Sequence, residues 1–465
     1  MAGNRVIFHC DCNSFYASVE LLTRPELKNV PVAVCGDPQH RHGIILAKNE
    51  PAKRYGIQTA ETVASARRKC PQLTLLLPHH ELYRAYSGRV NAIYARYTEF
   101  VEPFGIDESW LDMTASWHLF GPSPTAVAHR IRREVKAQTG LTISVGVSFT
   151  KAFAKLGSDY KKPDAVTEFS PQTYQALVWP LPVSSLLYVG RSARQALERL
   201  GITTIGQLAG AEPGVLEAAL GKLGAELWGF AHGEEGTPVR SVYEKREVKS
   251  VGNGLTFPRD LTTLADARAG LVSLSDEVAS RLRAHGLYAG AVQITVKDTG
   301  FKTITRQTQL ASPTHLAKDI AGAAVALLRQ NWRFPAPIRM LTVTALNVSH
   351  SAAAQLSLFE PEAGQDGSRR ESLEKSLDAI RDKFGKSAIA SGSTLRPDMG
   401  LGSLKIEEKH KKENETHGDA YRTLEPEGQI TEGTAGRRDE AQSGGTGGRC
   451  ARPFERPGGP RLQRL

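Results

Sequence analysis

The chain is poor in cysteine and has no long apolar run. None of its five cysteines belongs to a CxxC pair, so neither a zinc ribbon nor a disulfide framework is indicated. No stretch approaches about 18 consecutive apolar residues, which argues against a membrane span. The apolar segment that follows residues 1–5 is too short for the core of a signal peptide. We therefore expect a cytoplasmic protein in a reducing compartment.

The charge balance of the chain is basic. Its formal net charge is +10 and its isoelectric point is about 9.3. An excess of this size suits a polyanionic partner, either nucleic acid or a membrane surface, without proving one. The 465 residues are enough for several domains and a sizeable core.

Two adjacent acidic residues, Asp107 and Glu108, stand between two apolar runs. Residues 101–104 and 110–113 on either side are predicted to be strands. Neighbouring side chains of a regular strand point to opposite faces, so these carboxylates could share a ligand only at a turn or a bulge. Alone, such a pair is most often a solvated hairpin tip. A third carboxylate would change that interpretation, because clustered carboxylates repel each other unless a cation neutralises them.

Asp11 is a candidate for that third carboxylate. It closes a predicted buried strand at residues 6–10, where it could equally cap the following helix. Helices are predicted at residues 82–97 and 123–140, and a last strand at 141–147. If a basic insertion after the first strand is left out, the order is strand, helix, strand, strand, helix, strand. That is the split βαβ order of a ferredoxin-like sheet.

In a ferredoxin-like sheet, the end of the first strand and the turn between the second and third strands lie at one edge. Asp11 would then lie beside Asp107 and Glu108. Three carboxylates there would be costly without cations, and two Mg²⁺ ions roughly 3.5–4 Å apart would relieve the repulsion. The sequence therefore predicts a site for in-line phosphoryl transfer.

Several segments, taken in order, resemble the motifs of one enzyme family. Residues 10–20 (CDCNSFYASVE) resemble the opening motif of the Y-family translesion DNA polymerases, and residues 104–112 (FGIDESWLD) resemble their second metal motif. Segments within residues 181–208 resemble their thumb, and residues 249–253 (KSVGN) resemble the start of their little finger. The similarity spans nearly all of residues 5–395, and the DinB-like branch is the one the chain resembles most.

The resemblance implies an α+β multidomain fold, a right-hand polymerase with a ferredoxin-like palm and fingers. It adds a helical thumb with a helix-hairpin-helix, an α/β little finger and a disordered C-terminal tail. In the little finger, Lys302, Ile304 and Arg306 are predicted to share one strand face, along which DNA phosphates could lie. The expected boundaries are 1–13 and 81–168 for the palm, 14–80 for the fingers, 169–237 for the thumb, 238–248 for a linker, 249–350 for the little finger, 351–403 for a clamp-binding peptide and helix, and 404–465 for the tail.

The resemblance also assigns metal ligands. Asp11, Asp107 and Glu108 match the family's ligands, and the backbone carbonyl of Cys12 matches a further ligand of the nucleotide-side metal. Asp107 and Glu108 are the expected catalytic pair. The implied cofactor is Mg²⁺, with two ions in each active site.

The resemblance also assigns residues that bind the nucleotide. Tyr16 matches the steric gate, whose ring excludes a ribose 2′-hydroxyl, and Phe15 lies beside it under the incoming sugar. Lys162 matches a lysine that contacts the triphosphate. Lys53 stands where the family commonly has an arginine, so bidentate phosphate geometry is lost there. Glu50 replaces a phosphate-contacting tyrosine, and that role is not carried over.

Residues 355–359 (QLSLF) match the peptide by which bacterial polymerases bind the sliding clamp, also called the beta clamp. An apolar peptide in a polar segment needs such a partner to cover it. The expected anchors within this peptide are Gln355, Leu356, Leu358 and Phe359.

The resemblance implies a monomeric, template-directed and error-prone DNA polymerase that acts on primer-template DNA and dNTP without proofreading. A non-catalytic DNA-binding accessory subunit is an alternative, which the intact acidic set of Asp11, Asp107 and Glu108 argues against. A nucleotide cyclase also uses paired carboxylates on a ferredoxin-like sheet, but it would leave the thumb and the clamp peptide without a purpose.

Overall fold

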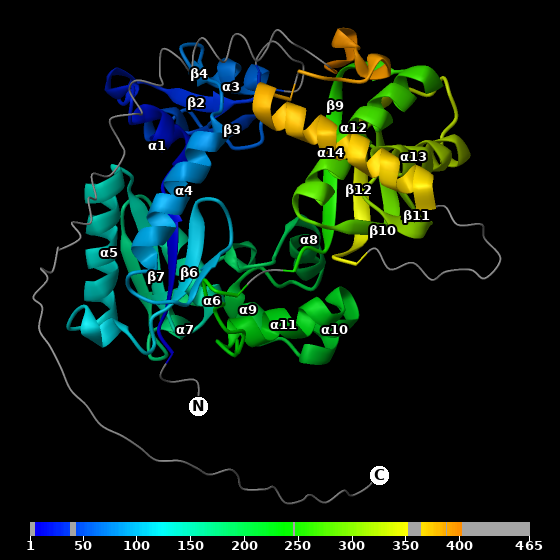
Figure 1. The fold of residues 1–465 in the computed structure, drawn as a ribbon. Coiled ribbons are helices and arrows are strands. Elements are labelled where there is room, and N and C mark those ends of the chain that lie inside the picture. Colours follow the sequence, from blue (N-terminus) through cyan, green and yellow to red (C-terminus); the bar gives the residue numbers. More distant parts are fainter. Residues whose placement is uncertain (1–4, 38–42, 245–246, 352–363, 387, 402–465) are drawn as a thin grey trace, which may run out of the picture. The chain divides into compact units, whose positions relative to one another are not determined.

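The computed structural model describes residues 5–37, 43–244, 247–351, 364–386 and 388–401, all within one compact unit of Met1–His410 (Figure 1). Their helices and three sheets confirm the predicted α+β class. No helix in these ranges is long and apolar enough to cross a membrane. The predicted clamp peptide and the predicted tail lie outside the described residues.

The palm contains a five-stranded sheet, formed by β1 (Ile7–Cys12), β5 (Val101–Pro103), β6 (Glu108–Asp112), β7 (Ile143–Ser148) and β8 (Val166–Phe169). Its strand order is β5-β6-β1-β7-β8. β1 pairs antiparallel with β6 and β7, and β5 pairs antiparallel with β6, which confirms the predicted ferredoxin-like arrangement. β8 extends the sheet parallel to β7, an addition that the sequence analysis missed.

The first strand is longer than predicted. Asp11 lies inside β1, and the side chain at the N-cap position of the next helix, Ser14, makes no capping hydrogen bond. The alternative interpretation of Asp11 as a helix cap is therefore wrong. The reason is that β1 has pairing partners on both sides, so its ladder continues through Cys12.

Helices cover both faces of the palm sheet. On one face, α4 (His80–Tyr94) and α5 (Pro124–Thr139) share a core with β1 and β7. On the other face, α6 (Lys151–Tyr160) packs so closely on β7 that a methyl group at Gly146 would lie 1.9 Å from the carbonyl oxygen of Ala154. Gly146 is thus required for α6 to approach the sheet.

The fingers contain a smaller sheet in the order β3-β2-β4. Asn49 begins α2 by accepting a hydrogen bond from the backbone N–H of Ala52, and Thr62 begins α3 in the same way through Ser65. The elements are α1 (Phe15–Leu21), β2 (Val32–Cys35), β3 (Ile45–Lys48), α2 (Glu50–Lys53), α3 (Val63–Lys69) and β4 (Thr74–Leu76).

The thumb is helical, and its core also includes Phe153 and Leu156 of α6 and Phe169 of β8. Gly190 forms the N-cap of its second helix, and Thr204 forms a capping box with Gln207 at its third. The helices are α7 (Tyr174–Val178), α8 (Arg191–Arg199), α9 (Ile205–Ala209), α10 (Pro213–Leu220) and α11 (Lys222–Ala231). The described residues also contain short 3₁₀ turns, which are η1 (Pro25–Leu27), η2 (Trp117–Leu119), η3 (Val183–Ser185), η4 (Gly392–Thr394) and η5 (Pro397–Met399).

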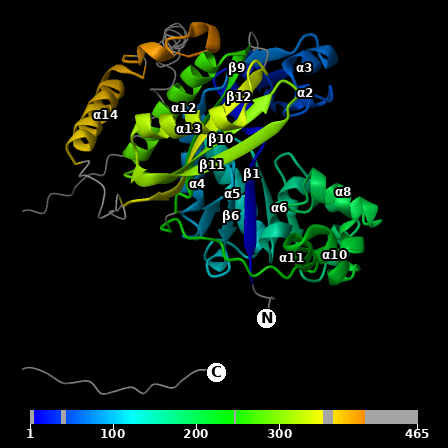
Figure 2. The same ribbon diagram turned by 90° about the vertical axis from the view of Figure 1, so that its right-hand side faces the viewer.

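The little finger is a four-stranded antiparallel sheet with helices on one face (Figures 1 and 2). Its sheet order is β11-β10-β12-β9. The elements are β9 (Ser250–Leu261), α12 (Leu264–Ala284), β10 (Tyr288–Asp298), β11 (Thr303–Thr314), α13 (Ala317–Asn331) and β12 (Ile338–Ser349).

Ile304 and Arg306 share one face of β11, as predicted, but Lys302 precedes the strand and the shared face is turned toward the helices. Ile304 packs against the apolar core, and Arg306 donates a 3.0 Å hydrogen bond to Asn331 at the end of α13. The face that carries Ile304 and Arg306 is therefore the one turned toward the helices. The residues that face away from them are mostly threonine and glutamine, including Thr305 and Gln307.

The chain returns to the little finger after β12. Helix α14 (Gly364–Phe384) is joined to α12 by ion pairs from Arg283 to Asp378, at 2.6 Å, and to Glu374. The segment that follows then contributes Met399 and Leu401 to the little-finger core, in which both are buried.

Candidate active site

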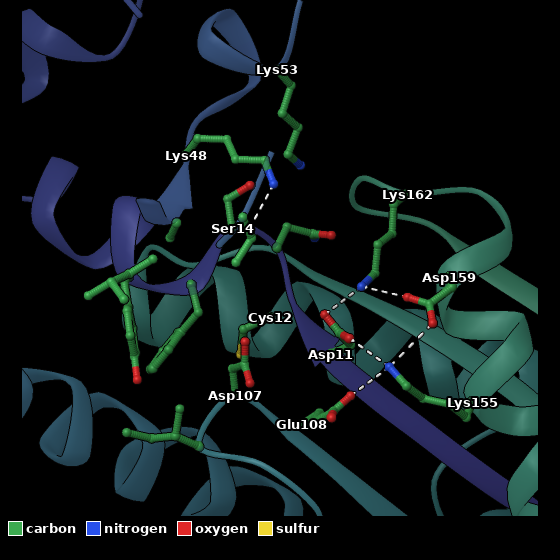
Figure 3. Close-up of a pocket in the computed structure, with 17 residues that line it drawn as sticks. Asp11, Cys12, Ser14, Lys48, Lys53, Asp107, Glu108, Lys155, Asp159 and Lys162 are labelled. Atoms are coloured by element: carbon green, nitrogen blue, oxygen red, sulfur yellow. Dashed lines mark hydrogen bonds and ion pairs between the residues drawn. The ribbon is translucent and has the colours of Figure 1, made fainter. Parts of the chain in front are cut away.

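Asp11, Asp107 and Glu108 meet at one edge of the palm sheet (Figure 3). Asp11 stands opposite Glu108 in the strand register, and the backbone N–H of Cys12 donates a 2.9 Å hydrogen bond to the carbonyl of Asp107. The prediction that the first strand and the hairpin turn share an edge is confirmed.

Strand alternation decides which way each side chain points. The side chain of Cys12 lies in the core shared with α4, so only the backbone of this residue can face the site. Asp11 and Glu108 instead point to the face that α6 covers. Asp107 lies just before β6, and Figure 3 shows it beside Cys12, turned away from Glu108. The two adjacent carboxylates thus diverge, and Asp11 lies on the side of Glu108, where both contact Lys155.

Two lysines stand among the carboxylates. Lys155 Nζ lies 2.6 Å from Glu108 and 3.3 Å from Asp11. Lys162 Nζ lies 2.8 Å from Asp11 and 2.8 Å from Asp159, which also contacts Lys155 at 3.3 Å. These ammonium groups already partly neutralise the acidic edge.

The lysines do not neutralise the site completely. Burial, followed by the charge of Asp11, raises the pKa of Asp107. Burial also raises the pKa of Glu108, even though Lys155 acts in the opposite direction. Burial alone would lower the pKa of Lys155, but the carboxylates around it outweigh burial and raise it. Additional positive charge beside Asp107 and Glu108 would therefore stabilise their ionised forms.

His9 cannot supply that charge. Its ring is fully buried, and its Nε2 lies 3.4 Å from Glu108 without a hydrogen-bond partner. Burial, followed by the charges of Lys155 and Lys162, lowers the pKa of His9 well below its ordinary value. The imidazole is consequently neutral at neutral pH and adds no positive charge to the acidic edge.

The acidic edge opens into a cavity of about 510 Å³, which is within the usual range for small-molecule sites. Phe15 and Tyr16 line it from α1, and Lys48 and Lys53 extend into it from the fingers, opposite Lys162 (Figure 3). The cavity therefore combines an aromatic wall with cations on two sides, which suits a ligand that carries both a ring and phosphates.

Lys53 does not reach the acidic edge. It is ion-paired with Glu50, one turn earlier on α2. Glu50, which replaces the family's tyrosine, thus partly neutralises the lysine that replaces its arginine.

Comparison with known proteins identifies the family. Residues 10–159 match the impB/mucB/samB family, and residues 248–358 match the C-terminal domain of that family, together more than half of the chain. The DNA polymerase IV of Acetivibrio thermocellus is 43% identical over 401 residues, which cover 86% of this chain and 100% of that protein. The chain belongs to the DinB-like branch of the Y-family DNA polymerases.

Further relatives support the assignment of this chain to the Y-family polymerases. The DNA polymerase IV of Clostridium kluyveri and the DNA polymerase IV 2 of Bacillus subtilis are each 35% identical, over 84% and 85% of this chain and 99% and 96% of their own. A solved Y-family DNA polymerase chimera aligns with a TM-score of 0.66, over 74% of this chain and 100% of its own, at 20% identity. At that identity the likeness concerns the fold alone.

The oxygen donors of the polymerase fit magnesium. Carboxylates and a backbone carbonyl are the ligands that Mg²⁺ takes in phosphoryl-transfer sites. Within the described residues, however, no three acidic, histidine or cysteine side chains are arranged as a metal cage. The ammonium groups of Lys155 and Lys162 lie among these carboxylates and pair with Asp11 and Glu108.

The raised pKa of Asp107 predicts a stability change in the metal-free polymerase. Folding raises this pKa, so protonated Asp107 contributes to the stability of the folded state at pH values below the ordinary carboxyl pKa. This contribution to stability is lost as the pH rises through the raised pKa and the carboxyl ionises. Asp107→Asn should therefore raise the thermal midpoint by about 1–3 °C at pH 7 in chelator, and by less at pH 4. Adding Mg²⁺ should stabilise the wild type more than the variant. A lower midpoint for the variant at pH 7 would contradict this.

The sequence analysis missed Lys155 and Asp159, although a signal for them exists. Thr150 caps α6 by accepting a hydrogen bond from the backbone N–H of Phe153, and a capping threonine before an apolar periodic segment is a readable helix start. In such a helix, residues four apart share one face, which places Lys155 and Asp159 together.

Proposed function

We propose that this polymerase adds dNMP from dNTP to a primer 3′-hydroxyl, directed by a template, through two-metal phosphoryl transfer. The observation that carries the proposal is the convergence of Asp11, Asp107 and Glu108 at one sheet edge, beside a cavity lined by Tyr16 and Lys162. Error-prone translesion synthesis without proofreading is the activity that membership of the family supports.

Asp11, Asp107 and Glu108 would hold two Mg²⁺ ions, together with the carbonyl of Cys12. When bound, such ions lower the pKa of the attacking hydroxyl and neutralise charge on the leaving oxygens. The position of Asp11 supports this assignment, because its charge adds to the effect of burial in raising the pKa of both Asp107 and Glu108, so it is near enough to each to serve both ions. Asp107 and Glu108 are the proposed catalytic pair.

The lysines of the site have two proposed roles, which are to balance the charge of the carboxylates and to bind the triphosphate. Lys155 contacts two of the three carboxylates, so it balances their charge while the site holds no nucleotide. Lys162 lines the cavity and would turn from Asp11 to the triphosphate. Lys53 would act from the fingers as a point charge rather than as a bidentate ligand. Phe15 and Tyr16 form the wall on which the sugar would rest.

The proposed partners are primer-template DNA and dNTP, bound by a monomer. Gly190 at the start of α8 presents backbone N–H groups, which can bind a DNA phosphate without reading sequence. We retain the boundaries given above for the palm, fingers, thumb and little finger as part of this proposal.

A single-nucleotide experiment tests the function. Purified full-length protein is incubated with a gapped primer-template, Mg²⁺ and each dNTP in turn. We expect efficient addition only of the nucleotide that pairs with the template base. Binding of the DNA without any addition would favour the accessory-subunit alternative and would make the acidic edge structural.

Recruitment to the sliding clamp is also proposed, through Gln355, Leu356, Leu358 and Phe359. The peptide comes between the end of β12 at Ser349 and the start of α14, so the chain tethers it to the little finger on both sides. Tethering to the clamp raises the effective concentration of the polymerase at the primer end.

Replacing both Leu358 and Phe359 with alanine should lower clamp-stimulated synthesis by about 10- to 100-fold. Clamp-independent synthesis should be unchanged, because neither residue belongs to the active site. The double variant Leu373→Ala and Phe384→Ala is a matched control, since it removes an exposed leucine and an exposed phenylalanine from α14. The assignment is wrong if clamp stimulation survives the first pair of changes or is lost equally with the second.

A further inference from the structure

A buried carboxylate that no part of the proposed chemistry uses lies on α1, the helix that contributes Phe15 and Tyr16 to the cavity. Glu20 of α1 has no exposed surface. It accepts hydrogen bonds from the Tyr83 hydroxyl at 2.6 Å, from His79 Nδ1 at 2.8 Å and from Arg24 at 2.7 Å. Burying a charge is costly unless its hydrogen bonds are satisfied, and here they are.

Glu20 is ionised in this setting. Burial alone would raise its pKa, but hydrogen bonds from His79, Tyr83 and Arg24 outweigh burial and lower it. Charge-assisted hydrogen bonds are stronger than neutral ones, so the phenol of Tyr83 is held firmly in place. The same contacts join α1 to the first turn of α4, on which Tyr83 lies.

Tyr83 in turn supports the proposed steric gate. Its ring is fully buried and stacks on the ring of Tyr16, with centroids 4.1 Å apart and planes at 12°. His80 packs edge-on against a second side of Tyr16, with ring centroids 5.9 Å apart. Glu20 lies one turn after Tyr16 on the same face of α1, so the gate, its backing ring and the carboxylate form one connected unit.

We propose that Glu20 is a positioning residue for sugar selection, which acts by holding Tyr83 and thereby the ring of Tyr16. This inference rests on the proposed role of Tyr16 as the gate. A ring excludes a 2′-hydroxyl only if it cannot move aside, and a displacement of about 1 Å is enough to loosen a site of this kind. Without its hydrogen bond to Glu20, Tyr83 can shift, and Tyr16 can shift with it.

A purely structural role predicts a different result. If Glu20 only joins two helices, then weakening its hydrogen bonds would lower kcat/KM for dNTP and kcat/KM for the matching rNTP by one common factor. If Glu20 positions the gate, efficiency with rNTP rises relative to dNTP. The ratio of the two kcat/KM values therefore separates the two roles, because loss of folded enzyme cancels in it.

The test uses Tyr83→Phe in the full chain, with Mg²⁺ and a gapped primer-template. This change keeps the stacked ring and removes only the hydroxyl. We expect the rNTP to dNTP ratio of kcat/KM to rise roughly three- to tenfold, the factor that corresponds to one hydrogen bond. Glu20→Gln, which keeps an acceptor but removes the charge, should shift the ratio in the same direction.

A matched control and a double variant complete the design. Tyr97→Phe also removes a buried phenol that donates to a carboxylate, that of Glu134, and it should leave the ratio unchanged. Tyr83→Phe should have no further effect on the ratio when added to Tyr16→Ala, because the ring that it positions is gone.

The possible outcomes are distinct. An unchanged ratio for Tyr83→Phe overturns the inference, and so does an equal rise in the Tyr16→Ala background. If Tyr16→Ala itself leaves the ratio at the wild-type value, the gate assignment fails and the positioning role of Glu20 falls with it.

Discussion

Glu108→Ala should lower single-nucleotide addition by at least about 10³-fold, the size of effect seen when a group that stabilises transition-state charge is removed. Glu108 is one of three carboxylates at the acidic edge, and it stands opposite Asp11 in the strand register. Without it, one cation loses a ligand, and Lys155 is left with Asp11 and Asp159 as its partners. Addition is measured under single-turnover conditions, with saturating complementary dNTP.

Affinity for primer-template DNA should stay within about twofold in the same variant, because phosphate contacts made elsewhere dominate the binding of DNA. The matched control is Asp112→Asn, which removes a carboxylate charge from the far end of the same strand, β6, where Asp112 pairs with Ile7. The control should extend primers at nearly the wild-type rate. Equal extension by Glu108→Ala and the wild type would falsify the proposed metal site.

Tyr16→Ala should raise the efficiency of rNTP addition relative to dNTP addition by about 10- to 100-fold. This is the range over which a pocket discriminates against a single added hydroxyl. Tyr16 lines the cavity, and its ring is backed by Tyr83, so removing it opens space where the sugar would rest. Single-nucleotide addition with each dNTP and its matching rNTP measures the change.

Tyr16→Phe is the informative control for this effect. Burial, followed by the charge of Asp107, raises the pKa of the Tyr16 hydroxyl, but exclusion by a ring needs no hydroxyl. The phenylalanine variant should therefore keep wild-type discrimination. If Tyr16→Ala and Tyr16→Phe both discriminated as the wild type does, another residue would have to be the gate.

The acidic edge was accessible to sequence analysis because topology determines it. Once the order of elements indicated a ferredoxin-like sheet, the end of β1 had to lie beside the turn before β6, whatever the intervening residues were. The extension of β1 through Asp11 was not accessible, because it depends on pairing with β6 and β7, which are distant in the chain.

Features that depend on which face is covered were harder to predict. Strand alternation correctly grouped Ile304 with Arg306, but only the packing of α13, with its Asn331, shows that this face is turned inward. Glu20 illustrates the same limit. Its sequence position resembles any helix surface, whereas its burial results from α4, whose first turn lies some sixty residues later.

The burial of Met399 and Leu401 bears on how the protein is made. Synthesis proceeds from the N-terminus at about 5–20 residues per second, so the stretch from Ser349 to Leu401 takes roughly 3–10 s. During that interval the strands of the little finger exist without the last side chains of their core. A nascent chain that stalls in this stretch would expose an apolar gap, and a gene shortened just after residue 359 would make that gap permanent.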